Sequence, residues 1–189
     1  MKTTLVKEIM IPLSDYAIVL EDDTLLEAVS SLKKAQEEFD QTRYRHRAII
    51  VFDKDRNVVG KLSQHDVIEA IEPDYKKLKK AGSEALHRFG FSDVFIDSAL
   101  EGYSLWSKPL MDLCRKAISQ RVKDVMYTPT EGEFIGENDS MDKAIHQLII
   151  GRHHSLLVTS AGGQEIVGVL RLTDVFQLVS DAFQECEPQ

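Results

Sequence analysis

The sequence predicts an α+β protein made of two β-α-β-β-α repeats with an all-helical insert between them. Three observations support this fold class: an internal repeat, short apolar strands that alternate with amphipathic helices inside each copy, and a strand-free segment between the copies. We place the first repeat at residues 1–72, the helical insert or linker at 73–120, and the second repeat at 121–189.

The internal repeat consists of three blocks that recur in the same order. The matching pairs are Val6–Met10 with Val122–Met126, Asp23–Ala28 with Asp139–Ala144, and Val59–Leu62 with Val167–Leu170. The first two pairs lie 116 residues apart and the third 108, so the first copy carries a net eight extra residues, around Lys33–Arg45. Agreement over three separated blocks in one order indicates a duplication.

The elements of the first repeat follow from apolar periodicity and turn chemistry. Thr24 and Glu27 have the spacing of a capping box at a helix start, and the polar run Asp53–Asn57 predicts a turn between two strands. Ser63 is placed as the N-cap of a helix that ends at Pro73. The expected strands are Ala17–Val19, Ala48–Phe52 and Val58–Leu62.

The second repeat follows the same plan, and the segment between the repeats has helical spacing. We expect strands at Phe134–Ile135, Ser155–Thr159 and Ile166–Leu170, and helices at Ser140–Ile150 and Thr173–Phe183. In the insert, Gly82, Gly90 and Gly102 are expected to divide the chain into short helices.

Composition narrows the class of protein. The 189 residues carry a formal net charge of −8 and no basic stripe, which argues against nucleic-acid binding. No apolar run approaches the roughly 20 residues of a membrane span, and no secretory signal opens the chain. The two cysteines, Cys114 and Cys186, are too few and too far apart for a disulfide framework. We expect a cytoplasmic protein with no membrane partner.

The block Gly60–Asp66 (Gly-Lys-Leu-Ser-Gln-His-Asp) resembles the Gly-x-aliphatic-(Ser/Thr)-x-x-Asp element of CBS domains, named after cystathionine β-synthase. The repeated Val-Lys-acid-aliphatic-Met opening is also similar to that family's repeat start. The resemblance implies two repeats packed about a pseudo-two-fold axis, with two clefts that hold AMP, ADP, ATP or S-adenosylmethionine. It also implies a homodimer that regulates a separate effector protein and performs no chemistry itself.

Ser63 and Asp66 have the chemistry that a ribonucleotide needs. A carboxylate one turn into a helix accepts hydrogen bonds from both ribose hydroxyls, and the N–H groups at the helix start favour phosphate. The alternative is that both residues only cap their helix. The second copy keeps Asp174 but has Arg171 where Ser63 stands, and Arg171 either binds a phosphate or closes the cleft with an ion pair to Asp174. We therefore rank the Asp66 cleft above the Asp174 cleft.

Basic residues precede the long strand in both copies, as Arg45-His46-Arg47 and Arg152-His153-His154. The resemblance implies phosphate contacts across the two-fold axis, from His46 and Arg47 to the Asp174 cleft and from Arg152, His153 and His154 to the Asp66 cleft. A solvated strand entrance is the alternative. The resemblance places the adenine beside the segments after each repeated Met, Ile11-Pro12-Leu13 and Tyr127-Thr128-Pro129. The sequence leaves Tyr16, Ile18 and Ile135 equally open to a core role.

The function predicted from these residues is a stand-alone regulatory module that senses an adenosine nucleotide, and not an enzyme. No phosphate-cradling glycine loop occurs, and His146, His153 and His154 lack further ligands at metal-site spacing, so no metal is expected. The alternative is a ligand-free dimerisation or protein-interaction module that acts through the helical insert. Its candidate contact residues are Phe89, Phe91, Phe95, Tyr103 and Trp106, and the favoured alternative for these side chains is burial of the insert against the two repeats.

Overall fold

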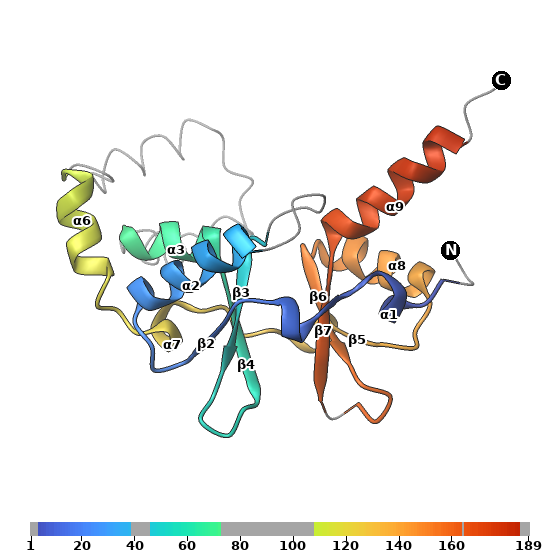
Figure 1. Ribbon diagram of the computed structural model, residues 1–189, viewed down its shortest axis with the longest axis horizontal. Coiled ribbons are helices and arrows are strands. Elements are labelled where there is room, and N and C mark those ends of the chain that lie inside the picture. The colour runs from blue at the N-terminus through green and yellow to red at the C-terminus, as the bar shows by residue number, and fades with distance from the viewer. Residues whose placement is uncertain (1–3, 39–45, 73–107, 164, 186–189) are drawn as a thin grey trace, which may run out of the picture.

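The computed structural model describes residues 4–38, 46–72, 108–163 and 165–185. It confirms the mixed α+β architecture, with one sheet and its helices in each repeat (Figure 1). Most of the predicted insert, including its aromatic residues and glycines, lies outside the described residues, as do Arg45, Pro73 and Cys186.

The first repeat contains the five elements predicted for it. They are β2 (Ile18–Leu20), α2 (Leu25–Glu38), β3 (Ala48–Phe52), β4 (Val58–Ser63) and α3 (Gln64–Ile71). The strand order is β2-β3-β4, with β2 and β3 parallel and β3 and β4 antiparallel. The capping box forms as predicted, because Glu27 Oε2 accepts from the backbone N and Oγ1 of Thr24 at 2.7 Å each, immediately before α2.

The second repeat follows the same order of elements, and helix α6 (Leu110–Ala117) lies within the range predicted for the insert. The sheet of the second repeat has the strand order β1 (Ile11–Pro12), β7 (Ile166–Arg171), β6 (Ser155–Thr159) and β5 (Phe134–Gly136). The elements are β5 (Phe134–Gly136), α8 (Met141–Gly151), β6 (Ser155–Thr159), β7 (Ile166–Arg171) and α9 (Leu172–Glu185).

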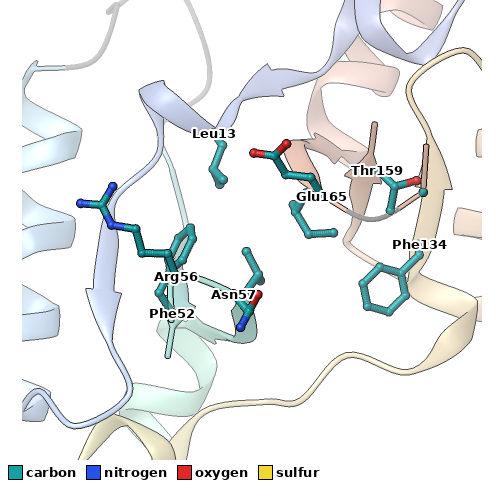
Figure 2. A pocket seen from close by; sticks show the side chains of 10 residues that line it. Leu13, Phe52, Arg56, Asn57, Phe134, Thr159 and Glu165 are labelled. Atoms are coloured by element: carbon teal, nitrogen blue, oxygen red, sulfur yellow. The ribbon is translucent and has the colours of Figure 1, made fainter. Parts of the chain in front are cut away.

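The two antiparallel hairpins, β3–β4 and β6–β7, lie side by side with their turns at the same end of the molecule (Figure 1). A cavity of about 300 Å³ lies between the turn ends (Figure 2). Phe52, Val58 and Ile166 from the hairpins line it, together with Leu13 and Phe134. Helices α3 and α9 start at the other end of the hairpins, where β4 and β7 finish.

Short elements that the sequence did not predict open each repeat. They are α1 (Val6–Ile9), β1 (Ile11–Pro12), the 3₁₀ turn η1 (Leu13–Asp15), α7 (Val122–Val125) and the 3₁₀ turn η2 (Glu131–Glu133). A helix of four residues has too few internal hydrogen bonds to be stable alone. These elements therefore depend on what they pack against.

The opening segments are exchanged between the repeats, so that each completes the other repeat (Figure 1). The N–H of Val6 donates to the carbonyl of Asp139, and the N–H of Val122 donates to the carbonyl of Asp23, both at 2.9 Å. Strand β1 pairs antiparallel with β7, and Tyr127, one residue after the second Met, pairs with Lys61 of β4 in the same way.

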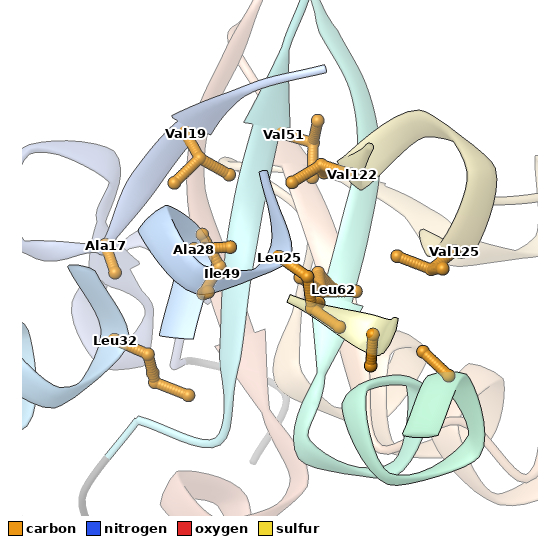
Figure 3. Packing of buried hydrophobic residues seen from close by; sticks show 12 residues of the cluster. Ala17, Val19, Leu25, Ala28, Leu32, Ile49, Val51, Leu62, Val122 and Val125 are labelled. Carbon is orange, nitrogen blue, oxygen red and sulfur yellow. The ribbon is translucent and has the colours of Figure 1, made fainter. Parts of the chain in front are cut away.

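Buried side chains follow this exchange. The core of the first repeat contains Val122 and Val125 of α7, packed with residues such as Leu25, Ile49 and Leu62 (Figure 3). The core of the second repeat contains Val6 of α1 in the same way. A third cluster joins the two sheets and consists of Ile11, Tyr16, Ile50, Leu157 and Val169. Burying apolar surface on both sides of the boundary holds the two repeats together.

Candidate functional site

Ser63 and Asp66 lie together at the junction of β4 and α3, as predicted. Asp66 Oδ2 accepts hydrogen bonds from the Ser63 backbone N at 2.8 Å and from Ser63 Oγ at 2.6 Å. Ser63 Oγ accepts in turn from the Asp66 N–H at 3.3 Å. This is a complete capping box, and it fixes the half-buried carboxylate of Asp66 at the start of the helix.

A buried polar cluster lies next to this junction. Glu133 is almost fully buried and accepts from the Lys61 ammonium and, at 2.5 Å, from the Tyr127 hydroxyl. Burial alone would raise the pKa of Glu133, but these two hydrogen bonds outweigh it and lower the pKa below its ordinary value. The hydrogen bond to Glu133 raises the pKa of Tyr127, and the charge of Asp66 adds to that shift, so Asp66 lies within electrostatic reach of the Tyr127 ring.

The equivalent junction of the second repeat is built differently. Arg171 Nε donates to Asp174 Oδ2 and Arg171 Nη2 donates to Asp174 Oδ1, both at 2.5 Å, in a two-pronged ion pair. Only 5% of Arg171 and 9% of Asp174 is exposed. Burial alone would lower the pKa of Arg171, but the hydrogen bonds and charge of Asp174 raise it. Of the two roles expected for Arg171, the structure shows the ion pair to Asp174.

His46 of the first repeat lies beside this ion pair, together with Tyr16. The two rings are 4.4 Å apart between centroids, and both residues are buried. Burial and, second to it, the positive charge of Arg171 lower the pKa of His46 to about 4. Burial likewise raises the pKa of Tyr16, and the charges of Arg171 and Asp174 also act on it. His46 is therefore close to Asp174 across the boundary between the repeats, whereas its neighbour Arg47 is exposed.

Arg152, His153 and His154 connect α8 to β6. Arg152 is exposed in the left-handed conformation, with φ 50°, and ends the helix. His153 lies against two glycines: a β-carbon added at Gly151 would collide with the imidazole, and one added at Gly132 would lie 3.6 Å from Nε2. The side chain of His154 is exposed.

The residues predicted to lie near the adenine occupy the exchanged segments. Pro12 is an exposed residue of β1 and pairs with Gly168 of β7. Thr128 is exposed and Pro129 is partly buried; they follow Tyr127, which is hydrogen-bonded through its backbone to Lys61. The exchange therefore places Thr128 and Pro129 on the side of the first repeat, beside the strand that leads to Ser63.

The cavity between the hairpin turns is at the opposite end of the first hairpin from Ser63 and Asp66. Val58 lines the cavity and Ser63 ends the same strand, about 16 Å away at about 3.3 Å per residue. Within the part of the chain that the structure describes, no three His, Cys, Asp or Glu side chains gather as a metal ion would require. In the same residues, no helix has both the length and the apolar character to cross a bilayer.

Sequence reasoning did not single out Lys61 or Glu133 as site residues; it placed Tyr127 only in the segment next to the adenine, and it left the role of Tyr16 open. One signal was present: Lys61 is a charged residue inside the strand Val58–Ser63, whose centre is otherwise apolar and buried. A lysine at such a position needs a partner, because burying an unpaired charge is costly. The identity of that partner, 72 residues away, follows only from the fold.

The order of the elements, the duplicated junction and the exchanged segments define a tandem pair of small α+β domains. A family model for the CBS domain matches residues 6–73 and 122–181. The chain therefore belongs to the CBS domain family and carries the domain twice. No curated protein matches the sequence.

Solved structures of CBS domain proteins share the fold. A CBS domain-containing protein of unknown function from Bacillus anthracis is 17% identical, with a TM-score of 0.61 over 95% of both chains. CBSX2 in complex with AMP is 16% identical, with a TM-score of 0.55 over 95% of this chain and 98% of that one. The CBS domain of a bacterial CNNM/CorC family Mg²⁺ transporter in complex with ATP is 15% identical, with a TM-score of 0.59 over 95% and 89%.

Proposed function

We propose that this protein is a regulatory module that binds an adenosine nucleotide at the junction of β4 and α3. The candidate ligands are AMP, ADP, ATP and S-adenosylmethionine. The observation that carries the proposal is the fixed carboxylate of Asp66 at the start of α3, in a chain of the CBS family whose structural relatives include complexes with AMP and ATP. The proposal assigns no reaction to the chain and leaves the regulated effector to a separate protein.

The geometry of Asp66 suits a ribose. Both hydrogen bonds from Ser63 fall on Oδ2, so within the described residues Oδ1 is the oxygen positioned to accept from a ribose hydroxyl. The N–H groups and positive dipole at the start of α3 favour an adjacent phosphate. Thr128 and Pro129, which lie beside β4 through the backbone pairing of Tyr127 with Lys61, are assigned to the adenine.

The basic residues of the other repeat are assigned to the phosphates. His46 precedes β3 by two residues and lies close to Asp174, across the boundary between the repeats. His153 precedes β6 by two residues, and the internal two-fold symmetry relates it to His46. By that symmetry we assign His153 and its sequence neighbours Arg152 and His154 to the phosphates of a nucleotide bound at Asp66. Arginine is well suited to such a contact, because its planar fork matches phosphate oxygens.

Isothermal titration calorimetry with the four candidate ligands tests the proposal, on protein first freed of carried-over nucleotide. We expect Asp66→Ala to weaken binding about 10-fold to 100-fold, the effect of losing hydrogen bonds to a charged group. Asp55→Ala, which removes an exposed aspartate from the turn at the far end of the hairpin, serves as the matched control and should bind as the wild type does. No binding of any of the four ligands would overturn the proposal.

A homodimer is the second part of the proposal. Large apolar side chains are exposed on helices of both repeats: Leu26 and Val29 on α2, Ile68 on α3, Ile149 and Ile150 on α8, and Phe176 and Phe183 on α9. Contiguous exposed apolar surface usually marks a contact site. A second copy of the chain offers the same surface, which is what a symmetric interface requires.

Analytical ultracentrifugation measures the assembly. Ile149→Glu places a charge on the exposed face of α8 and is expected to convert a dimer to a monomer, because an unpaired charge buried in an interface is costly. Ala161→Glu adds the same charge in the exposed turn at the other end of the molecule and is expected to leave the dimer intact. A wild-type protein that sediments as a monomer at high micromolar concentration would contradict the dimer.

A ligand-free interaction module is the alternative function, acting through the insert. In the described part of the insert, Leu110 and Met111 of α6 are exposed apolar residues that fit such a role. The two functions predict different calorimetry: this alternative requires that none of the four nucleotides binds.

A further inference from the structure

Arg171 and Asp174 occupy, in the second repeat, the positions that Ser63 and Asp66 occupy in the first. Each pair spans the junction between the last strand and the last helix of its repeat. In the first repeat a short hydroxyl caps the helix and Asp66 stays half-buried. In the second a long guanidinium replaces the hydroxyl, and both oxygens of Asp174 receive a hydrogen bond from it at 2.5 Å.

The side chains around the two junctions also differ in size. Tyr16 and His46 pack together beside the Arg171–Asp174 pair, and all four side chains are buried. At the first junction, the residue equivalent to Tyr16 is Gly132, which has no side chain. Four buried side chains therefore fill one cleft, whereas the other contains a glycine and a serine at two of the equivalent positions.

The guanidinium of Arg171 has the same donor pattern as a ribose. Its Nε–H and Nη–H point the same way and supply one hydrogen bond to each oxygen of a carboxylate. A ribose supplies two hydroxyl donors on adjacent carbons to the same acceptor. The two-pronged contact on Asp174 therefore satisfies the carboxylate as the sugar of a nucleotide would, and Arg171 brings a permanent positive charge in addition.

We infer that Arg171 is a built-in substitute for the ligand in the second cleft, so that each chain binds one nucleotide and not two. The identity of the excluded ligand rests on the proposed function. The ion pair between Arg171 and Asp174, which closes the second cleft, also links β7 to α9. This link is present whether or not a nucleotide is bound at the first cleft. Only the Asp66 cleft then responds to the nucleotide concentration.

Binding stoichiometry tests this inference, with AMP as the probe in calorimetry. We expect one AMP per chain for the wild type and the same site weakened about 10-fold to 100-fold in Asp66→Ala. The double variant Asp66→Ala/Arg171→Ser, in which removal of the guanidinium frees Asp174, is expected to bind one AMP more tightly than Asp66→Ala does. Asp174→Asn, which keeps an acceptor for the guanidinium of Arg171, is the matched control and is expected to bind one AMP with wild-type affinity. Two AMP per wild-type chain would overturn the inference. So would a double variant that keeps its cooperative thermal transition but binds AMP no more tightly than Asp66→Ala does.

A ligand-free measurement separates this inference from the proposed function. In wild-type protein without nucleotide, the Nε–H proton of Arg171 is expected to exchange with solvent at least 10-fold more slowly than that of the exposed Arg152, assigned from spectra of Arg171→Lys and Arg152→Lys. Fast exchange at Arg171 would overturn the closed cleft. If the wild type binds none of the four nucleotides but Arg171 is protected, the proposed function fails and the closed cleft remains.

Discussion

Lys61 and Glu133 form a buried ion pair at a place where the second repeat has only apolar residues. The internal symmetry relates Lys61 to Val169, since these residues pair with Tyr127 and Ile11 in the two sheets. It likewise relates Glu133 to Ala17, because each precedes the short strand of its repeat by one residue. An apolar pair therefore fits the equivalent position. The presence of a buried ion pair does not by itself mean that the pair stabilises the fold.

Removing one partner of this pair is expected to be costly. Lys61→Met leaves the carboxylate of Glu133 buried without its main counter-charge, and the free energy of unfolding should fall by about 3–5 kcal/mol, measured by urea denaturation. In a Glu133→Gln background, which keeps an acceptor for Tyr127, the same substitution should cost much less. Equal costs in the two backgrounds would show that Lys61 and Glu133 are not coupled.

His46 makes stability depend on pH in a defined window. Its pKa is about 4 in the folded protein, whereas an unfolded histidine titrates near 6.5. Between these values the unfolded chain binds more protons than the folded one, so the free energy of unfolding falls as the pH drops. The total loss down to pH 4 is up to about 3 kcal/mol.

Urea denaturation between pH 5 and pH 7 measures this dependence above the range in which buried carboxylates such as Glu133 titrate. His46→Gln is expected to flatten the slope, because glutamine does not titrate. The prediction fails if the variant keeps the wild-type slope. Asp15 and Asp174 oppose the shift of the His46 pKa, so Asp174→Asn should lower that pKa further and extend the loss of stability to lower pH, while the slope between pH 5 and pH 7 stays the same.

At the scale of elements, two glycines permit the exchanged segments to pair with the hairpins. A β-carbon at Gly168 would lie 2.6 Å from the carbonyl oxygen of Ile11, which belongs to the backbone of β1. At Gly60 the nearest atom would be the Met126 sulfur at 2.5 Å, at the flexible end of a side chain. The glycine of the family motif therefore has a structural role in the close approach of two backbones.

Gly168→Ala is expected to destabilise the protein by about 1–3 kcal/mol, because β1 would have to move away from β7. Gly60→Ala should cost less, since the Met126 side chain can change rotamer. Gly162→Ala is the control, because its added methyl group meets no atom within 4 Å. Thermal denaturation of the three variants gives the ranking, and a cost for Gly168→Ala no larger than that of Gly162→Ala would contradict it.

The elements that sequence reasoning predicted are those defined by local signals. The apolar run Ala48–Phe52, the turn Asp53–Asn57 and the caps at Thr24 and Ser63 each depend on residues within a few positions of one another. Helix α1 was missed because four residues show no helical period. It is held by hydrogen bonds to Glu137, Asn138 and Asp139, which lie 130 to 133 positions further along the chain. The polar cluster at Glu133 was missed for the same reason, since only the exchange brings Tyr127 to Lys61.

At the scale of the whole molecule, each repeat depends on a short segment that belongs, in the sequence, to the other repeat. Val6 and Val122 are both fully buried, and each lies in the core of the repeat to which its sequence block does not belong. Val6→Ala removes packing from the second core, and Val122→Ala removes it from the first. Each is expected to cost about 2 kcal/mol.

Hydrogen exchange distinguishes the two variants. Val6→Ala should speed exchange most in β5, β6 and β7, although position 6 lies in the first repeat of the sequence, and Val122→Ala should speed it most in β2, β3 and β4. Each variant is the matched control of the other. The reverse pattern, with each substitution loosening its own repeat, would contradict the exchange of segments.

The exchange of α1 and α7 also imposes an order on synthesis. When residue 72 leaves the ribosome, the first hairpin has been made, but Val122 and Val125, which close its core, have not. For the second repeat the order is reversed, because Val6, which belongs to its core, has already been synthesised when β5 to β7 emerge. The nascent first half must therefore remain unfinished while about 50 further residues are added, a delay of a few seconds at typical rates of translation. The half that is translated last is the half that can fold first.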